Sequence, residues 1–93
     1  GTKIAYILNE DEQKSFNESI EKTLNENDDQ NSNQWISKTN PDKKGIITPL
    51  NSYSQNGKDC RDFKKVIVKN EESIEEISKA CRDIQGNWQV IEG

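Results

Sequence analysis

The chain contains no histidine, and only two of its 93 residues are cysteines. Histidine is the commonest general base and the commonest zinc ligand, and two cysteines alone do not complete an ordinary structural zinc site. No stretch comes near the roughly 20 consecutive apolar residues that a membrane-spanning helix needs, and no signal peptide is recognisable. Histidine-based catalysis, a zinc site and a transmembrane helix are therefore not expected in this sequence.

Apolar side chains are scarce as well. Hydrophobic residues make up 29% of the chain and charged residues 32%, and leucine, isoleucine, valine and phenylalanine together occupy 19 positions. This composition lies at the edge of the range in which chains stay disordered, but a net charge of −4 causes little self-repulsion. We therefore expect one small domain with a thin core. The acidic balance argues against nucleic acid as a partner.

The N-terminal part of the chain predicts one helix. Residues 1–8 are an apolar stub, expected to be a docking strand or the end of a preceding segment. Residues 9–24 predict a helix, because Asn9 is a good N-cap and acidic residues fill the first turn. Phe16, Ile20 and Leu24 recur every fourth residue and form one narrow apolar stripe. We expect this stripe to pack within the molecule, and docking of a partner on it is the alternative.

The chain changes character after this helix. Residues 25–34 contain no apolar side chain and predict a mobile acidic and polar linker. Their carboxylates lack the glycine and the final glutamate of an EF-hand loop, so no calcium site is expected. Residues 35–93 alternate short apolar runs with turn dipeptides, which predicts an antiparallel β domain. The expected strands include residues 35–38, 46–53, 60–69 and 88–91.

Residues 71–82 allow two interpretations. Taken alone they favour a helix, since Ile74, Ile77 and Cys81 would share one face, with acidic residues first and basic residues last. A hairpin with a two-residue turn at Asn70 and Glu71 instead brings five complementary pairs together, each a recognised cross-strand contact. These pairs are Cys60 with Cys81, Asp62 with Lys79, Lys65 with Glu76, Ile67 with Ile74, and Lys69 with Glu72. The five pairs favour the hairpin, and the helix remains the alternative.

The two cysteines have 20 residues between them and do not form the Cys-x-x-Cys motif of a redox site. One disulfide or two buried thiols remain, and the hairpin register favours a disulfide between Cys60 and Cys81. A bridge of this span adds roughly 3 kcal/mol by restricting the unfolded chain. A disulfide also implies an oxidising compartment, such as the periplasm or the cell exterior.

No catalytic motif is recognisable in the sequence. The glutamates between the turn and Cys81 lie among other charged residues, where a solvated face is expected rather than a catalytic carboxylate pair. We therefore expect no enzyme activity, and the least favoured alternative is a small hydrolase using Glu72 and Glu76 or a groove near Trp88. Aromatic side chains are expected to pack in the core rather than line a ligand groove. The candidate partner-binding residues are Phe16, Ile20, Leu24, Trp35 and Trp88.

A series of short motifs recurs in an order typical of one bacterial family. In this chain they are Asp11-Glu12-Gln13, Trp35, Asn40-Pro41-Asp42, Thr48-Pro49 with Tyr53, Gly57, Cys60-Arg61-Asp62-Phe63, Ala80-Cys81-Arg82 and Gly86-Asn87-Trp88-Gln89-Val90. From Asp11 onward, the chain resembles the C-terminal domain of the rickettsial 17-kilodalton common surface antigen family, outer-membrane lipoproteins with a glycine-zipper segment. The family's Gly-Gly turn falls on Asn70 and Glu71, where this chain has no glycine and carries more glutamates before Cys81.

The resemblance implies a cell-envelope module without catalytic residues. The family's lipid-bearing cysteine and glycine-zipper helices have no counterpart here, so membrane attachment is implied only through a segment outside these 93 residues. We expect an α+β fold, in which an N-terminal amphipathic helix packs on a small antiparallel meander of about four or five strands with one disulfide.

The expected function is a structural or binding role as the soluble C-terminal domain of a surface-antigen-like outer-membrane lipoprotein. This domain is expected in the bacterial cell envelope, either periplasmic or surface-exposed, with envelope or outer-membrane proteins as partners. The alternative is an adaptor or subunit of an envelope or secretion assembly that docks through the N-terminal helix. No small-molecule substrate, cofactor or metal is expected.

Overall fold

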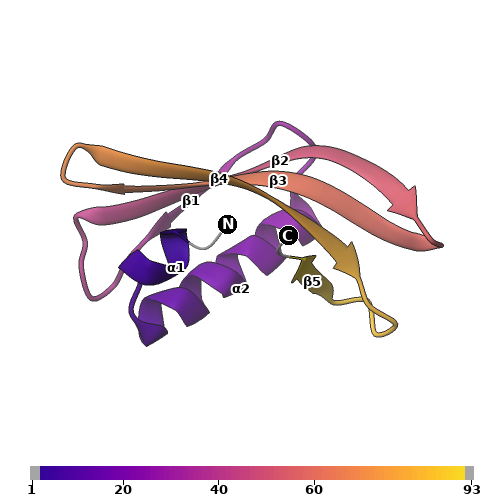
Figure 1. The fold of residues 1–93 in the computed structure, drawn as a ribbon, viewed down its shortest axis with the longest axis horizontal. Coiled ribbons are helices and arrows are strands. Elements are labelled where there is room, and N and C mark those ends of the chain that lie inside the picture. The colour runs from indigo at the N-terminus through magenta and orange to yellow at the C-terminus, as the bar shows by residue number, and fades with distance from the viewer. Residues whose placement is uncertain (1–2, 92–93) are drawn as a thin grey trace.

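The computed structural model describes residues 3–91, which form two helices and one five-stranded antiparallel sheet. The elements are α1 (Lys3–Ile7), α2 (Glu10–Glu26), β1 (Asn33–Ile36), β2 (Lys43–Gln55), β3 (Lys58–Lys69), β4 (Glu72–Arg82) and β5 (Trp88–Ile91). The strands lie in the sheet in chain order, from β1 to β5. The sheet arches over α2, and the β2–β3 and β3–β4 hairpins extend toward opposite ends of the molecule (Figure 1). The predicted α+β class and the antiparallel sheet are confirmed.

Helix α2 begins with a capping box at the predicted N-cap. The Asn9 side chain accepts a hydrogen bond from the Glu12 backbone N–H at 2.8 Å, and the Glu12 carboxylate accepts one from the Asn9 N–H at 3.0 Å. These two bonds satisfy donors that a helix start otherwise leaves unpaired. The helix runs to Glu26, two residues beyond the predicted end at Leu24, and Asn27 closes it through a hydrogen bond to the Thr23 carbonyl.

The apolar N-terminal segment forms a helix within the described residues, where we expected a docking strand or a stub. Ile4 in α1 and Leu8 directly after it are both buried in the core. The ammonium of Lys43, on β2, donates to the Ile7 carbonyl at 2.7 Å. This hydrogen bond stabilises α1, because the last carbonyl groups of a helix have no hydrogen-bond partner within the helix.

The polar linker is attached to the sheet by hydrogen bonds. The Gln30 backbone N–H donates to the Pro49 carbonyl at 2.7 Å, and its side-chain amide donates to the Leu50 carbonyl at 2.8 Å. Ser52 donates to the Asp29 carboxylate at 3.0 Å. This part of β2 extends past the short strand β1, so the linker covers backbone groups that no strand pairs. The linker therefore has several contacts with the sheet, although it contains no apolar side chain.

The β3–β4 hairpin has the predicted register. Its turn is Asn70 and Glu71, and all five predicted pairs lie opposite one another, including Cys60 with Cys81. The helical alternative for residues 71–82 is wrong. Helical propensity acts through near neighbours along the chain, whereas here a ladder with β3 satisfies the backbone groups of β4 over almost its whole length.

Glycine at position 71 is expected to stabilise the protein. Asn70 and Glu71 have φ angles of 53° and 64°, in the left-handed region that glycine adopts most easily. Backbone strain at a non-glycine residue in this region costs about 1–3 kcal/mol. Glycine avoids the strain, but part of this gain is offset because glycine makes the unfolded chain more flexible. Glu71→Gly should therefore raise the free energy of unfolding by about 1 kcal/mol in urea titrations.

The β2–β3 turn provides the matched control, because it has Gly57 at φ 77° in the equivalent place after Asn56. Nothing lies within 4 Å of a Cβ atom built on Gly57, so Gly57→Ala measures backbone strain without a steric clash. We expect Gly57→Ala to lower the stability by about 1 kcal/mol. A Glu71→Gly variant that is no more stable than the wild type would contradict this account of the turn.

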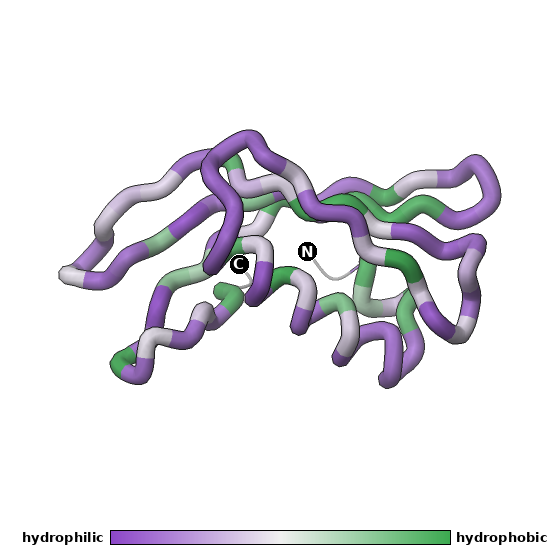
Figure 2. Tube along the Cα trace, turned by 180° about the vertical axis from the view of Figure 1, so that it is seen from behind, coloured by the Kyte–Doolittle hydropathy of each residue, from purple (hydrophilic) through white to green (hydrophobic). Residues whose placement is uncertain are grey.

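The core lies between the two helices and the inner face of the sheet. Its centre is a T-shaped contact between the rings of Phe16 and Trp35, whose centroids are 5.2 Å apart. Gly45 lies directly under this pair, and a Cβ atom there would come within 2.9 Å of Phe16 Cε1. Hydrophobic positions gather where α2 meets the sheet, while the tips of the long hairpins are hydrophilic (Figure 2). The core is thin, as the composition predicts.

Candidate functional site

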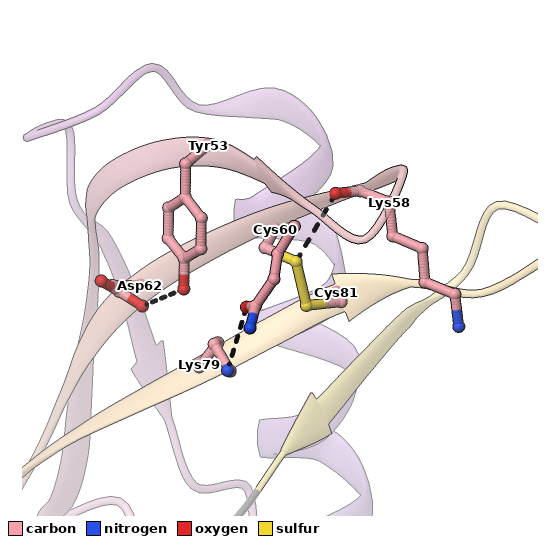
Figure 3. The surroundings of a disulfide bond; sticks show 7 residues. Tyr53, Lys58, Cys60, Asp62, Lys79 and Cys81 are labelled. Atoms are coloured by element: carbon pink, nitrogen blue, oxygen red, sulfur yellow. Dashed lines mark hydrogen bonds between the residues drawn. A yellow bond between two sulfur atoms is a disulfide. The ribbon is translucent and has the colours of Figure 1, made fainter.

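The predicted disulfide is present. Cys60 on β3 and Cys81 on β4 form it, and neither cysteine of the chain is free (Figure 3). Next to it, the Tyr53 hydroxyl donates to the Asp62 carboxylate at 2.8 Å. Partial burial of the hydroxyl, followed by this hydrogen bond and the charge of Asp62, raises the pKa of Tyr53. Both cysteines are buried, and the bond joins the two strands of the hairpin covalently.

All five candidate partner-binding residues belong to the core. Phe16, Ile20, Leu24, Trp35 and Trp88 are each less than 9% exposed. The two indole N–H groups are also satisfied internally, since Trp35 donates to Ser15 at 2.9 Å and Trp88 donates to Asn25 at 3.0 Å. These side chains attach α2 to the sheet. The docking interpretation of the helix stripe is corrected accordingly, because a core this small needs every large apolar side chain that faces it.

A cavity of about 730 Å³ opens between the helices and the β3–β5 side of the sheet. Its apolar walls include Phe16, Ile20 and Trp88, and its sheet side carries Lys65 and Glu76. We call this space the inner groove. Helix α2 packs mainly on β1 and β2, and near β5 its Glu21 carboxylate accepts a hydrogen bond from the Trp88 backbone N–H at 3.2 Å.

The inner groove contains a buried carboxylate oxygen without a hydrogen bond, beside a lysine. Lys65 Nζ and Glu76 Oε1 lie 3.9 Å apart, and their side chains are only 8% and 9% exposed. Glu76 Oε2 accepts a hydrogen bond from the Lys3 backbone N–H at 2.9 Å, but Oε1 has no hydrogen-bond partner. Buried carboxylate oxygens are normally hydrogen-bonded. The groove therefore contains an acceptor that is available to a donor entering from outside.

The glutamate cluster is divided by the pleat of the sheet. Glu75 points to the outer face, where its carboxylate lies 3.8 Å from Lys64 Nζ, and Glu71 and Glu72 are exposed. Glu76 alone points inward and lines the groove. The predicted solvated face holds for three of the four glutamates. The sequence predicts the pairing of Glu76 with Lys65, but it contains no signal that the pair faces inward.

Two arginines hold the C-terminal end of α2, a role that the sequence analysis missed. Arg61 on β3 donates to the Leu24 carbonyl at 2.7 Å and to the Asp29 carboxylate at 2.7 Å. The hydrogen bond from Arg61 lowers the pKa of Asp29. Arg82 on β4 stacks on the Trp88 ring, 4.4 Å from its centroid. Because the last turn of α2 has no basic residue, these arginines supply the positive charge that complements the helix dipole there.

A second buried ion pair joins the start of α2 to β2. Glu12 and Lys43 are 2% and 4% exposed, and their charged atoms lie 2.9 Å apart. Burial alone would raise the pKa of Glu12, but hydrogen bonds from Ser37, the Asn9 backbone, Lys43 and Asn40 outweigh it and lower the pKa to about 2. Both carboxylate oxygens have partners, so this network is structural.

Within residues 3–91, no group of three or more metal-ligating side chains is arranged to hold a metal ion. Neither of the two helices in this range is long and apolar enough to cross a membrane. Comparison with known proteins finds no family model, no curated protein and no solved structure that matches this chain.

Proposed function

We propose that this chain is a non-enzymatic module of a bacterial cell envelope, the soluble C-terminal domain of a surface-antigen-like outer-membrane lipoprotein with a structural or binding role. The observation that supports the proposal best is the Cys60–Cys81 disulfide, which uses both cysteines of the chain. Structural disulfides form and persist in oxidising compartments, such as the periplasm and the cell surface.

The motifs behind the family resemblance have structural roles in this fold, which suits a module without catalytic residues. Each cysteine is followed by an arginine, in Cys60-Arg61 and in Cys81-Arg82. The cysteines join β3 to β4, and the arginines turn to the opposite face and contact the end of α2 or the loop beyond it. A repeated Cys-Arg pair therefore locks the hairpin and holds the helix against it.

Cell fractionation combined with thiol alkylation tests this proposal. The full-length protein should be recovered with the outer membrane, and its cysteines should resist alkylation in denaturant until a reductant is added. The Cys60→Ser variant is the control, because its remaining thiol should label without reductant. Recovery from the cytosol alone, with both thiols reactive in the unfolded chain, would contradict the proposal.

The alternative function as an adaptor needs a surface other than the buried helix stripe. The outer face of the sheet, which neither α1 nor α2 covers, offers Ile36, Ile46, Ile77 and Ile91, each at least 40% exposed. We propose an envelope protein as the partner of this face. Ile77→Ser should then abolish capture of that protein from envelope extracts. Ile84→Ser, which changes a fully exposed isoleucine in the β4–β5 turn, should not. Equal capture by both variants would exclude the outer face as the contact surface.

A further inference from the structure

We propose that the inner groove binds a small, uncharged, hydroxyl-bearing molecule with an apolar face, of the size of a mono- or disaccharide. This inference goes beyond the proposed function, because it assigns a ligand site to a chain for which a structural or protein-binding role is expected. It is also independent of the cellular location of the protein, since it depends only on the groove.

The first argument is the size and lining of the groove. Sites for small molecules typically occupy about 300–1,000 Å³, combine apolar walls with a few polar groups, and lie where secondary-structure elements meet. The inner groove has about 730 Å³ and lies between α1, α2 and the β3–β5 side of the sheet. Ala5 and Val90 are the exposed apolar residues of its lining, and they offer surface for the carbon skeleton of a ligand.

The second argument is the unpartnered carboxylate oxygen. Glu76 Oε1 is buried, lines the groove and accepts no hydrogen bond. An unsatisfied buried acceptor is less favourable than a satisfied one, because it has lost its hydrogen bonds to water without gaining another. A hydroxyl group of a ligand can donate to Oε1 and recover this free energy, which an apolar ligand cannot do.

The third argument concerns charge. Lys65 and Glu76 lie 3.9 Å apart on the sheet side of the groove, so an ammonium ligand that reaches Oε1 also approaches a cation. A carboxylate ligand meets Lys14 and Lys65 in the lining, but also Glu18, Glu21 and Glu76. A charged ligand of either sign therefore meets like charges as well as opposite ones, so attraction and repulsion offset each other, whereas a neutral ligand is subject to neither.

The fourth argument is the polar rim. Gln13, Asn17 and Gln89 line the groove, and each amide side chain both donates and accepts hydrogen bonds. A hydroxyl group has the same dual capacity, so several hydroxyls on one ligand match several amides. The Gln13 amide already donates to Asn17 at 3.1 Å, which leaves the Gln13 carbonyl oxygen and the Asn17 amide protons for a ligand.

Titrations followed by two-dimensional ¹H–¹⁵N NMR test the proposal with three related sugars. N-acetylglucosamine is neutral, glucosamine is a cation and glucuronate is an anion at pH 7. N-acetylglucosamine should shift the backbone resonances of Ala5, Asn17 and Gln89, which line the groove, saturably below about 50 mM, as millimolar affinity requires. The Trp35 indole, which borders a separate cavity with Glu12 and Lys38, should not move. The two charged sugars should bind at least about fivefold more weakly.

The variants Glu76→Gln and Glu75→Gln form a matched pair, because adjacent glutamates on one strand point to opposite faces. Glu76→Gln should weaken N-acetylglucosamine binding at least about fivefold, since it replaces the strong acceptor by an amide. Glu75→Gln should bind as the wild type does. Circular dichroism establishes that both variants fold, and the charge series on the wild type does not depend on them. No shift of groove resonances, equal binding of all three sugars, or equal binding by the two variants would overturn the proposal.

Discussion

Replacing Glu12 by glutamine should lower the free energy of unfolding by about 3 kcal/mol at pH 7. Breaking a buried ion pair typically costs about 3–5 kcal/mol, because the remaining charge stays buried without its partner. In Glu12→Gln the Lys43 ammonium keeps only the Ile7 carbonyl at 2.7 Å among its present oxygen contacts. Glutamine retains the shape of the side chain, so the change reports charge rather than packing. Urea titration provides the measurement.

The pH dependence of this effect follows from the direction of the pKa change. The pKa of Glu12 is lowered from 4.5 to about 2 in the folded protein, so folding favours the ionised carboxylate. Its contribution, about 3 kcal/mol, is fully present above pH 4.5 and is lost as the pH falls toward 2. The wild type and Glu12→Gln should therefore differ by about 3 kcal/mol at pH 7 and by less than about 1 kcal/mol at pH 2.

Glu10→Gln is the control for Glu12→Gln. Glu10 lies in the same first turn of α2 and is exposed, and its substitution should change the stability by no more than about 0.5 kcal/mol. A difference between the wild type and Glu12→Gln that stays constant from pH 7 to pH 2 would show that the Glu12 charge is not responsible for it.

Removing the disulfide should cost a similar amount. The bond joins residues 21 positions apart, and a loop of this length restricts the unfolded chain by about 3 kcal/mol. Small domains of this kind have only about 5–15 kcal/mol of total stability, so the double variant Cys60→Ala/Cys81→Ala should unfold at a clearly lower urea concentration. Its sheet should remain, because the β3–β4 ladder continues well beyond the cysteines.

The reduced wild type provides the control for the double variant. It has the same covalent chain topology, so both should unfold at nearly the same urea concentration, and both should lose stability relative to the oxidised protein. A double variant within about 1 kcal/mol of the oxidised wild type would mean that the hairpin already restricts the unfolded chain without the bond.

The β3–β4 hairpin could be predicted from the sequence because its register is specified by pairs of complementary residues. Two strands joined by a two-residue turn have one register, and that register either matches complementary residues or does not. Cys60 with Cys81 and Ile67 with Ile74 are pairs of this kind. The start of α2 could also be predicted, since Asn9 and the acidic first turn act on backbone groups within one helical turn.

Features that depend on where α2 lies could not be predicted. Alternation along β4 puts Glu75 and Glu76 on opposite faces, but only the position of the helix decides which face is buried. The contact of Arg61 with the Leu24 carbonyl joins residues 37 positions apart, and no local pattern specifies it. The inner groove follows from the same cause, because its walls come from segments that meet only after the helix has packed on the sheet.

The order of the strands has a consequence for how the protein folds. Each strand of the sheet pairs only with strands next to it in the sequence, so every contact within the sheet is made between consecutive strands. Each hairpin can form from its own residues as the chain emerges from a ribosome or a translocation channel, without waiting for a distant partner. Cys60 and Cys81 both precede β5 in the chain, so their pairing does not require β5. The core closes only when α2, an early segment, docks on the sheet, because Phe16, Ile20 and Leu24 are part of that core.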